Sequence, residues 1–356
     1  MRIAQIVSQI ESVPPQGKNG LEFIVSWLTE ELVERGHDVT LFAPADSKTK
    51  AKLVSICPKA LSRDPNSLIP ANVYDYWNMV YAMKFADQFD VIHAHSLAPA
   101  YFRQICKTPI VRTSHHPISR QWLAHYNDPY YHKYLKKLED IKEDGYKVFV
   151  SQNQKKASFS RGQKSYTVYN GIPIDNFKFN PTPKDYFAFF GFINHDKGAH
   201  IAVQVARKAG VKLLIAGIYK KEEDFFNKEI KPYLNDKIKY IGPITNYKDK
   251  SEFLGNARGL LVPIQWEEPF GLVMPEAMAC GAPPIAFRRG AVSEIINHEK
   301  NGFIVDTEKQ MISAIKNIDK IKREECRKRV EKNFTIENMV DRYEEVYRKV
   351  VDNLKK

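Results

Sequence analysis

Short apolar runs alternate with amphipathic segments along the whole chain, a pattern typical of α/β units with parallel sheets. Between the first two runs, apolar residues from Leu21 to Leu32 recur at helical spacing, and Gly36 suits the end of a helix. The first half therefore predicts a helix at residues 21–35 and strands at residues 2–7, 39–43, 91–94, 110–113 and 147–150.

A second series of the same kind begins near Tyr186. Its predicted strands are residues 186–190, 212–216, 238–241, 259–262 and 284–287, separated by helical segments such as 198–208 and 250–257. A turn-rich stretch from Asn170 to Pro183 has the composition of a linker. Because 356 residues exceed one ordinary core, we expect two Rossmann-like α/β domains, residues 1–174 and 175–337.

The formal net charge of +12 indicates either an anionic binding partner or a role in keeping the protein soluble. A nucleic acid, an anionic membrane or a phosphorylated substrate would each fit. The Lys and Arg residues are spread thinly and no nucleic-acid module is recognisable, which disfavours nucleic acid. Four well-separated cysteines, no signal peptide and no apolar run of membrane-spanning length predict a cytoplasmic protein, with peripheral contact at the inner membrane face as an open alternative.

The segment from Trp266 to Phe287 carries the most specific chemistry, because Glu268 and Glu276 flank a loop-to-helix transition with seven residues between them. We expect a helix over residues 272–280 whose first free amides, at residues 271–273, would attract phosphate. The alternative without a function is that Glu268 and Glu276 are solvent-exposed acids at the start of a helix.

These residues resemble the Glu-x7-Glu signature of the family 4 retaining glycosyltransferases, including Pro-Phe-Gly after the first Glu and Glu-Ala-Met-Ala-Cys-Gly around the second. The resemblance implies a GT-B architecture, with two Rossmann-like domains facing a cleft and a last helix, about residues 338–356, crossing back to the first domain. It implies that Glu268 contacts the donor sugar and that Glu276 binds the ribose of a nucleotide sugar. The donor site would then also include Phe270, Gly271, Leu272 and Val273.

Two further segments match the family. Lys197, in the run from Gly191 to Gly198, corresponds to the lysine that neutralises the donor diphosphate, and Gly20 corresponds to a glycine that faces the donor. Phe192 stands where the family usually has arginine. Lys220, Lys221 or Arg289 could replace that charge, or Lys197 and the helix end at Gly271 could carry it alone.

Histidines gather at the ends of two predicted strands, His93 and His95 at one and His115 and His116 at the next. The resemblance implies a catalytic histidine near the reacting sugar at His115, and an acceptor-side role at His95. A metal-dependent hydrolase using His93, His95 and His115 is the rival class, although no Asp or Glu follows at ligand spacing.

The combined expectation is a metal-independent hexosyltransferase, with Glu268, Lys197 and His115 at its centre. No Asp-x-Asp follows a predicted strand, so we expect no metal and no cofactor besides the nucleotide-sugar donor. A UDP-sugar is favoured and a GDP-sugar is the alternative. The acceptor would be a sugar or a lipid-linked molecule, and the tyrosines and lysines of residues 128–142 form either a solvated helix or a membrane-facing surface.

Overall fold

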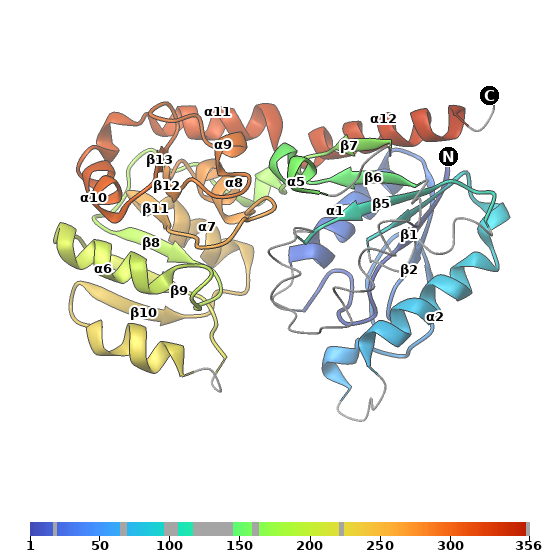
Figure 1. Cartoon of the computed structure of the whole chain (residues 1–356), viewed down its shortest axis with the longest axis horizontal. Helices are drawn as coiled ribbons and strands as arrows, with labels where there is room; N and C mark the ends of the chain where they lie inside the picture. The colour runs from blue at the N-terminus through green and yellow to red at the C-terminus, as the bar shows by residue number, and fades with distance from the viewer. Residues whose placement is uncertain are drawn as a thin grey trace. The chain divides into compact units, whose positions relative to one another are not determined.

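The computed structural model describes residues 1–16, 20–64, 70–95, 106–116, 145–158, 164–220 and 224–353. The chain forms two compact units (Figure 1). Unit 1 comprises Met1–Gly171 together with Ile336–Lys356, and unit 2 comprises Ile172–Thr335. The last segment of the chain therefore belongs to the same unit as the first.

Unit 1 contains a seven-stranded parallel sheet in the order β3-β2-β1-β4-β5-β6-β7. The strands are β1 Arg2–Ile6, β2 Asp38–Phe42, β3 Lys52–Val54, β4 Val91–Ala94, β5 Ile110–Ser114, β6 Tyr146–Phe149 and β7 Ser165–Thr167. The order turns back between β1 and β4, and such a switch point is where open α/β sheets bind ligands at the carboxyl ends of their strands.

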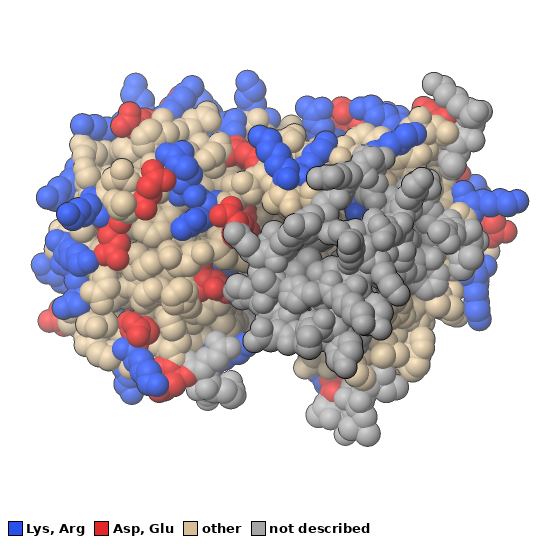
Figure 2. Space-filling view, viewed as in Figure 1, with Lys and Arg blue, Asp and Glu red and all other residues tan. Residues whose placement is uncertain are grey.

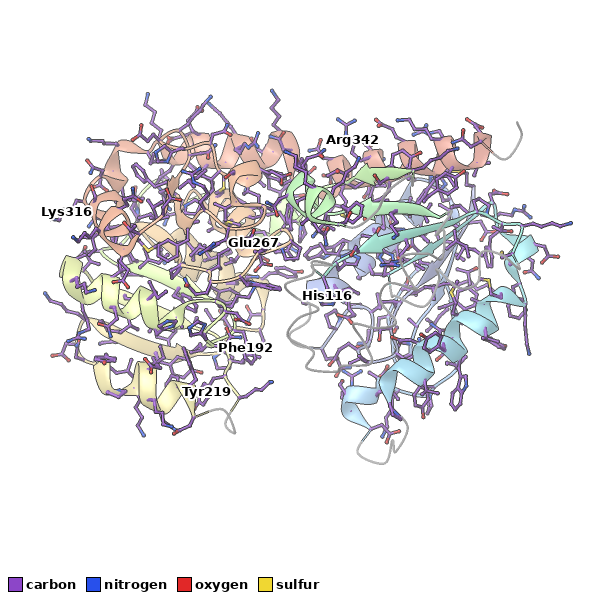
Figure 3. The ribbon with its side chains drawn as sticks, in the orientation of Figure 1. His116, Phe192, Tyr219, Glu267, Lys316 and Arg342 are labelled. Atoms are coloured by element: carbon purple, nitrogen blue, oxygen red, sulfur yellow. The ribbon has the colours of Figure 1, made fainter. Side chains whose placement is uncertain are left out.

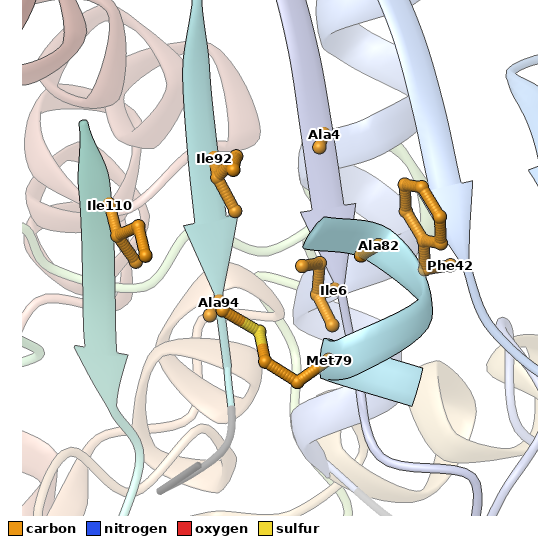
Figure 4. Packing of buried hydrophobic residues seen from close by; sticks show 8 residues of the cluster. All are labelled: Ala4, Ile6, Phe42, Met79, Ala82, Ile92, Ala94 and Ile110. Carbon is orange, nitrogen blue, oxygen red and sulfur yellow. The ribbon is translucent and has the colours of Figure 1, made fainter. Parts of the chain in front are cut away.

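Alternation along the strands divides the side chains of this sheet between two helical layers. The described helices of unit 1 are α1 Gly20–Glu34, α2 Ala71–Met83, α5 Gln152–Ala157 and α12 Ile336–Asp352. On the α2 face lies a buried apolar cluster of Ala4, Ile6, Phe42, Met79, Ala82, Ile92, Ala94 and Ile110 (Figure 4). Because Gln5 and His93 alternate with members of this cluster, their side chains point to the opposite face. Helix α12 packs there, against α1 and β4.

Unit 2 contains a six-stranded parallel sheet in the order β10-β9-β8-β11-β12-β13. Its strands are β8 Phe187–Phe190, β9 Leu213–Ala216, β10 Ile238–Gly242, β11 Gly259–Val262, β12 Pro284–Phe287 and β13 Phe303–Val305. Its α-helices are α6 Ala199–Ala209, α7 Tyr247–Gly255, α8 Val273–Ala279, α9 Val292–Ile295, α10 Glu308–Lys316 and α11 Arg323–Asn333. The switch point of this sheet lies between β8 and β11.

The expected strands are all present, with ends that shift by a residue in several cases. Three short strands, β3, β7 and β13, were not expected, and each contains only three residues at or near a sheet edge. The helix expected over residues 272–280 is shorter, because it begins at Val273 and ends at Ala279. Residues 128–142 lie outside the described part of the chain.

Candidate functional site

The turn after β8 presents Lys197 at the carboxyl edge of the second sheet. Gly198 adopts a φ of 74°, and a Cβ there would lie 1.9 Å from the carbonyl oxygen of Pro263, so the turn presses directly on the segment that follows β11. The backbone amide of Lys197 donates to Oδ1 of Asn194 at 2.9 Å. Glycine is therefore required to bring the lysine this close to the β11 loop.

The β11 loop supplies the partners of Lys197. Its ammonium forms an ion pair with Glu268 and lies 4.9 Å from the centre of the Trp266 indole ring. The indole Nε1 donates to Oε2 of the same carboxylate at 3.0 Å. Lys197 and Glu268, which the sequence predicted separately, are thus brought together at the switch point between β8 and β11.

Two glycines fix the loop that carries Glu268. Gly290 has a φ of 52°, and a Cβ at this position would lie 2.1 Å from the carbonyl oxygen of Glu268. Gly271 has a φ of 86°, and a Cβ there would lie 3.2 Å from Cγ of Glu268. The close approach of residue 290 to the backbone of Glu268 therefore requires glycine, and the positive φ of residue 271 favours glycine beside the Glu268 side chain.

Glu276 forms a second, more deeply buried ion pair. Its Oε1 accepts a hydrogen bond from Nζ of Lys250 at 2.5 Å, and the Lys250 ammonium lies 4.7 Å from the centre of the Phe190 ring. Burial raises the pKa of the Glu276 carboxyl, and the Lys250 charge works in the opposite direction. Each of the two predicted glutamates therefore has its own lysine.

The start of α8 has free backbone donors, as expected from the sequence. Among the described residues, the amides of Gly271, Leu272 and Val273 donate no hydrogen bond, whereas the amide of Met274 already bonds the carbonyl of Gly271. The side chains of Leu272 and Val273 are half-buried. The Phe270 ring is buried against Phe334, so only the main chain of Phe270 can face a ligand.

The candidate replacements for the missing arginine have different surroundings. Phe192 is half-buried after β8, and Glu267 lies in the β11 loop (Figure 3). Arg289 lies 4.0 Å from Glu267, Lys220 is exposed, and Lys221 falls outside the described residues. Lysine and arginine side chains are scattered over the face drawn in Figure 2.

The sequence did not single out Lys250 or Trp266, since a lysine on a polar helix and a tryptophan before a loop carry no spacing signal.

In unit 1, Gly20 is the exposed first residue of α1. His93 and His95 lie at the end of β4, beside the switch point between β1 and β4, and His115 follows the neighbouring strand β5. His93 is fully buried and both its ring nitrogens are bonded, to Tyr347 and Thr113 at 2.7 Å each. His93 is therefore a satisfied strand histidine, with both ring nitrogens engaged inside unit 1.

His95 and His115 are joined to each other. Nδ1 of His95 lies 3.0 Å from Nε2 of His115, and Nε2 of His95 lies 2.7 Å from Oε1 of Gln5. His95 is buried, so it can influence a ligand only through His115. Burial, assisted by the neighbouring His116, lowers the pKa of His115 to about 3, and therefore this imidazole is neutral near pH 7.

The hydrolase alternative gains no support from this arrangement. The ring nitrogens of His93 and His95 are all used within the protein, and within the described ranges no group of three or more His, Cys, Asp or Glu residues is placed to hold a metal ion. The same part of the chain contains no helix with the length and apolar character needed to cross a membrane.

Two parallel-sheet units, each with polar side chains at its switch point, define the class of Rossmann-like two-domain proteins. Sequence profiles identify the chain further: residues 18–176 match Glycosyltransferase Family 4, and residues 173–335 match Glycosyl transferases group 1. The chain therefore belongs to the group 1 family of glycosyltransferases.

Several known proteins resemble the chain over most of its length. An uncharacterized glycosyltransferase of Methanocaldococcus jannaschii is 24% identical, over 86% of this chain and 85% of the relative. The sucrose-phosphate synthase of Thermosynechococcus elongatus superposes with a TM-score of 0.78 at 20% identity, covering 99% of this chain and 100% of that one. The Anabaena protein HepE, in complex with UDP and glucose, superposes with a TM-score of 0.74 at 17% identity, covering 98% and 100%. These structural likenesses establish the GT-B fold.

Proposed function

We propose that this glycosyltransferase moves a hexose from a nucleotide-diphosphate sugar to an acceptor hydroxyl, with retention of configuration at the anomeric carbon and without a metal ion. What supports the proposal is the ion pair between Lys197 and Glu268 at the switch point of unit 2. It joins the lysine assigned to the diphosphate with the carboxylate assigned to the sugar, and both follow neighbouring strands of one sheet. A UDP-sugar is the favoured donor, since HepE was crystallised with UDP and glucose.

In this proposal the diphosphate lies against Lys197 and the free amides of Gly271, Leu272 and Val273, which stabilise the negative charge that grows as the leaving group departs. The sugar displaces Lys197 in part from Glu268, and that carboxylate then accepts hydrogen bonds from sugar hydroxyls. Glu276, paired with Lys250, accepts from the ribose hydroxyls. Gly20 and the main chain of Phe270 complete the donor site.

His115 is the proposed catalytic histidine, and His95 acts behind it on the acceptor side. A neutral imidazole offers one acceptor and one donor, so it can bind a sugar hydroxyl without repelling a developing positive charge on the sugar. We assign residues 1–174, together with the last helix, to the acceptor side and residues 175–337 to nucleotide-sugar binding.

A thermal-shift screen tests the donor. Binding to the native state raises stability by mass action, so UDP-glucose or UDP should raise the melting temperature of the wild-type protein, and GDP-mannose should do so only if the base preference is wrong. Glu276→Ala should abolish most of the shift. A nucleotide that stabilises both proteins equally would contradict the role of Glu276. For a nucleotide sugar that is turned over, NMR of the anomeric proton in the product tests retention.

The acceptor proposal is a sugar or a lipid-linked molecule reached from the cytoplasm, with peripheral contact at an anionic membrane. The net charge of +12 supports this choice, because each basic residue near an anionic surface adds about 1 kcal/mol of attraction. Co-sedimentation with anionic vesicles should fade as salt is added. Equal recovery in the supernatant with neutral and anionic vesicles at low salt would favour a water-soluble acceptor.

A further inference from the structure

A continuous chain of buried hydrogen bonds runs through unit 1 from the C-terminal helix α12 to His115. Nε2 of Gln5 donates to the Tyr347 hydroxyl at 3.2 Å, and Oε1 of Gln5 accepts from Nε2 of His95 at 2.7 Å. Nδ1 of His95 then meets Nε2 of His115 at 3.0 Å. Gln5, His95 and Tyr347 are all buried, so solvent does not compete for the two contacts of Gln5.

The fold dictates why these side chains meet. Gln5 lies on β1 opposite His93 of β4, and both point away from the apolar cluster under α2. Tyr347 reaches the same face from α12, which is 17 residues long and packs on α1 and β4. A helix encoded at the far end of the chain therefore closes a polar layer on the first strands.

Each hydrogen bond between Tyr347 and His115 along this series of side chains has a defined direction. A carboxamide has one donor end and one acceptor end, so Gln5, which donates to Tyr347, must accept from His95. Nε2 of His95 consequently carries the proton. Burial lowers the pKa of His95 well below its ordinary value, so the ring is neutral and its Nδ1 can only accept. His115 must then donate from Nε2.

We propose that Tyr347, Gln5 and His95 form a positioning relay that fixes His115 as the Nε2–H tautomer and leaves its Nδ1 lone pair for a hydroxyl of the bound substrate. Among the described residues, Nδ1 of His115 has no hydrogen-bond partner, and it is not a buried unsatisfied atom. The inference rests on the proposed function for the role of His115, but the tautomer itself does not depend on that role.

The Tyr347 hydroxyl is the element that orients the relay. It accepts from Gln5, and its oxygen also lies within hydrogen-bond distance, 2.7 Å, of Nδ1 of His93. In Tyr347→Phe, the amide nitrogen of Gln5 loses its acceptor, and the carboxamide is free to rotate and donate to Nε2 of His95. The proton of His95 then moves to Nδ1, and His115 must accept at Nε2 and carry its proton on Nδ1.

Long-range 15N–1H NMR of histidine-labelled protein reads the tautomer directly. We expect wild-type His115, assigned by its loss in His115→Ala, to be the Nε2–H form, and Tyr347→Phe to convert at least half of it to the Nδ1–H form. Tyr343→Phe is the matched control, because Tyr343 is equally buried on α12 and its hydroxyl bonds Thr113 at 3.0 Å rather than Gln5. This control should leave the tautomer of His115 unchanged.

An unchanged Nε2–H form in Tyr347→Phe would overturn the relay, as would an equal change in Tyr343→Phe. Turnover of the nucleotide sugar found in the thermal-shift screen gives the second readout. Misplaced catalytic groups can cost about 100-fold in rate, so Tyr347→Phe should lower kcat on the order of 10-fold with KM unchanged. Unaltered turnover in His115→Ala would refute the role of His115 in the proposed function and would leave the tautomer result standing.

Discussion

Replacing Lys250 by methionine tests the buried ion pair that holds Glu276. The Lys250 side chain is 17% exposed and that of Glu276 is 5% exposed, so the pair is shielded from solvent. Methionine keeps an unbranched side chain of similar shape and removes the ammonium group, with its ion pair to Glu276 and its contact with the Phe190 ring. Removing one partner of a buried pair typically costs about 3–5 kcal/mol, because the remaining charge is left without compensation.

The loss should depend on pH, because Glu276 can take up a proton instead of remaining charged. Burial already raises its pKa above the ordinary 4.5, and the loss of Lys250 removes the main opposing influence. A carboxyl with a raised pKa binds a proton in the folded state that the unfolded chain has released. The free energy of unfolding therefore falls as pH rises through the interval above 4.5. We expect the full deficit of Lys250→Met at about pH 8 and a much smaller deficit at about pH 5.

Hydrogen exchange of the α8 amides measures this deficit as a local opening free energy, independent of how the two units unfold. Lys208→Met is the matched control, because its pair with Glu308 is 57% and 38% exposed and should contribute less than about 1 kcal/mol. The double variant Lys250→Met with Glu276→Gln should recover most of the loss. A deficit that does not change with pH, or an equal deficit in Lys208→Met, would refute the reasoning.

Three further predictions follow from the described contacts. Lys197→Ala should lower kcat more than it raises KM, because charge on the diphosphate grows as it departs; steady-state kinetics that show only a raised KM would assign that charge to another residue. Gly198→Ala should lower the free energy of unfolding by about 2–5 kcal/mol, because the new Cβ would meet a main-chain carbonyl. Gly210→Ala should lower it by only about 1–2 kcal/mol, because Gly210 has a similar φ but open space around it. Melting temperatures that fall equally in the two variants would contradict this. The pKa of His115 is lowered from its ordinary value of 6.5 to about 3 in the folded protein. Below pH 6.5 the unfolded chain therefore binds a proton that the folded protein does not, and the free energy of unfolding should fall by about 1.4 kcal/mol for each pH unit. A pH series of melting curves should show that His115→Asn lacks this part of the pH dependence.

The sequence predicted the strands well where an apolar run is long enough to be buried on both faces. Strands β4 and β11 are fully buried and were predicted with their observed ends. Strands β3, β7 and β13 contain three residues each, which is too short for periodicity to register. The sheet order could not be read from local pattern, because it depends on pairing between distant segments.

For the candidate site, Glu268 and Glu276 could be predicted from one motif of fixed spacing and Lys197 from a second, both through the resemblance to the family. It could not show that each glutamate has its own lysine. Lys250 precedes Glu276 by 26 residues, and their contact exists only because α7 and α8 pack together. The sequence also could not predict which histidine donates and which accepts, because Gln5 sets the direction of these hydrogen bonds and nothing marks it out in the first strand.

Helix α12 also bears on how the chain is made. Unit 2 is one continuous segment, Ile172–Thr335, whereas unit 1 is interrupted by it and closed by residues from Ile336 onward. During translation, unit 2 can fold as soon as it has left the ribosome, but Tyr347 reaches the first sheet only after all of unit 2 has been synthesised. Until then the polar layer on β1 and β4 faces solvent without its cover. Unit 1 therefore matures last although its first strands are synthesised first, and a nascent chain stalled before α12 should hold a folded C-terminal unit beside an unfinished N-terminal one.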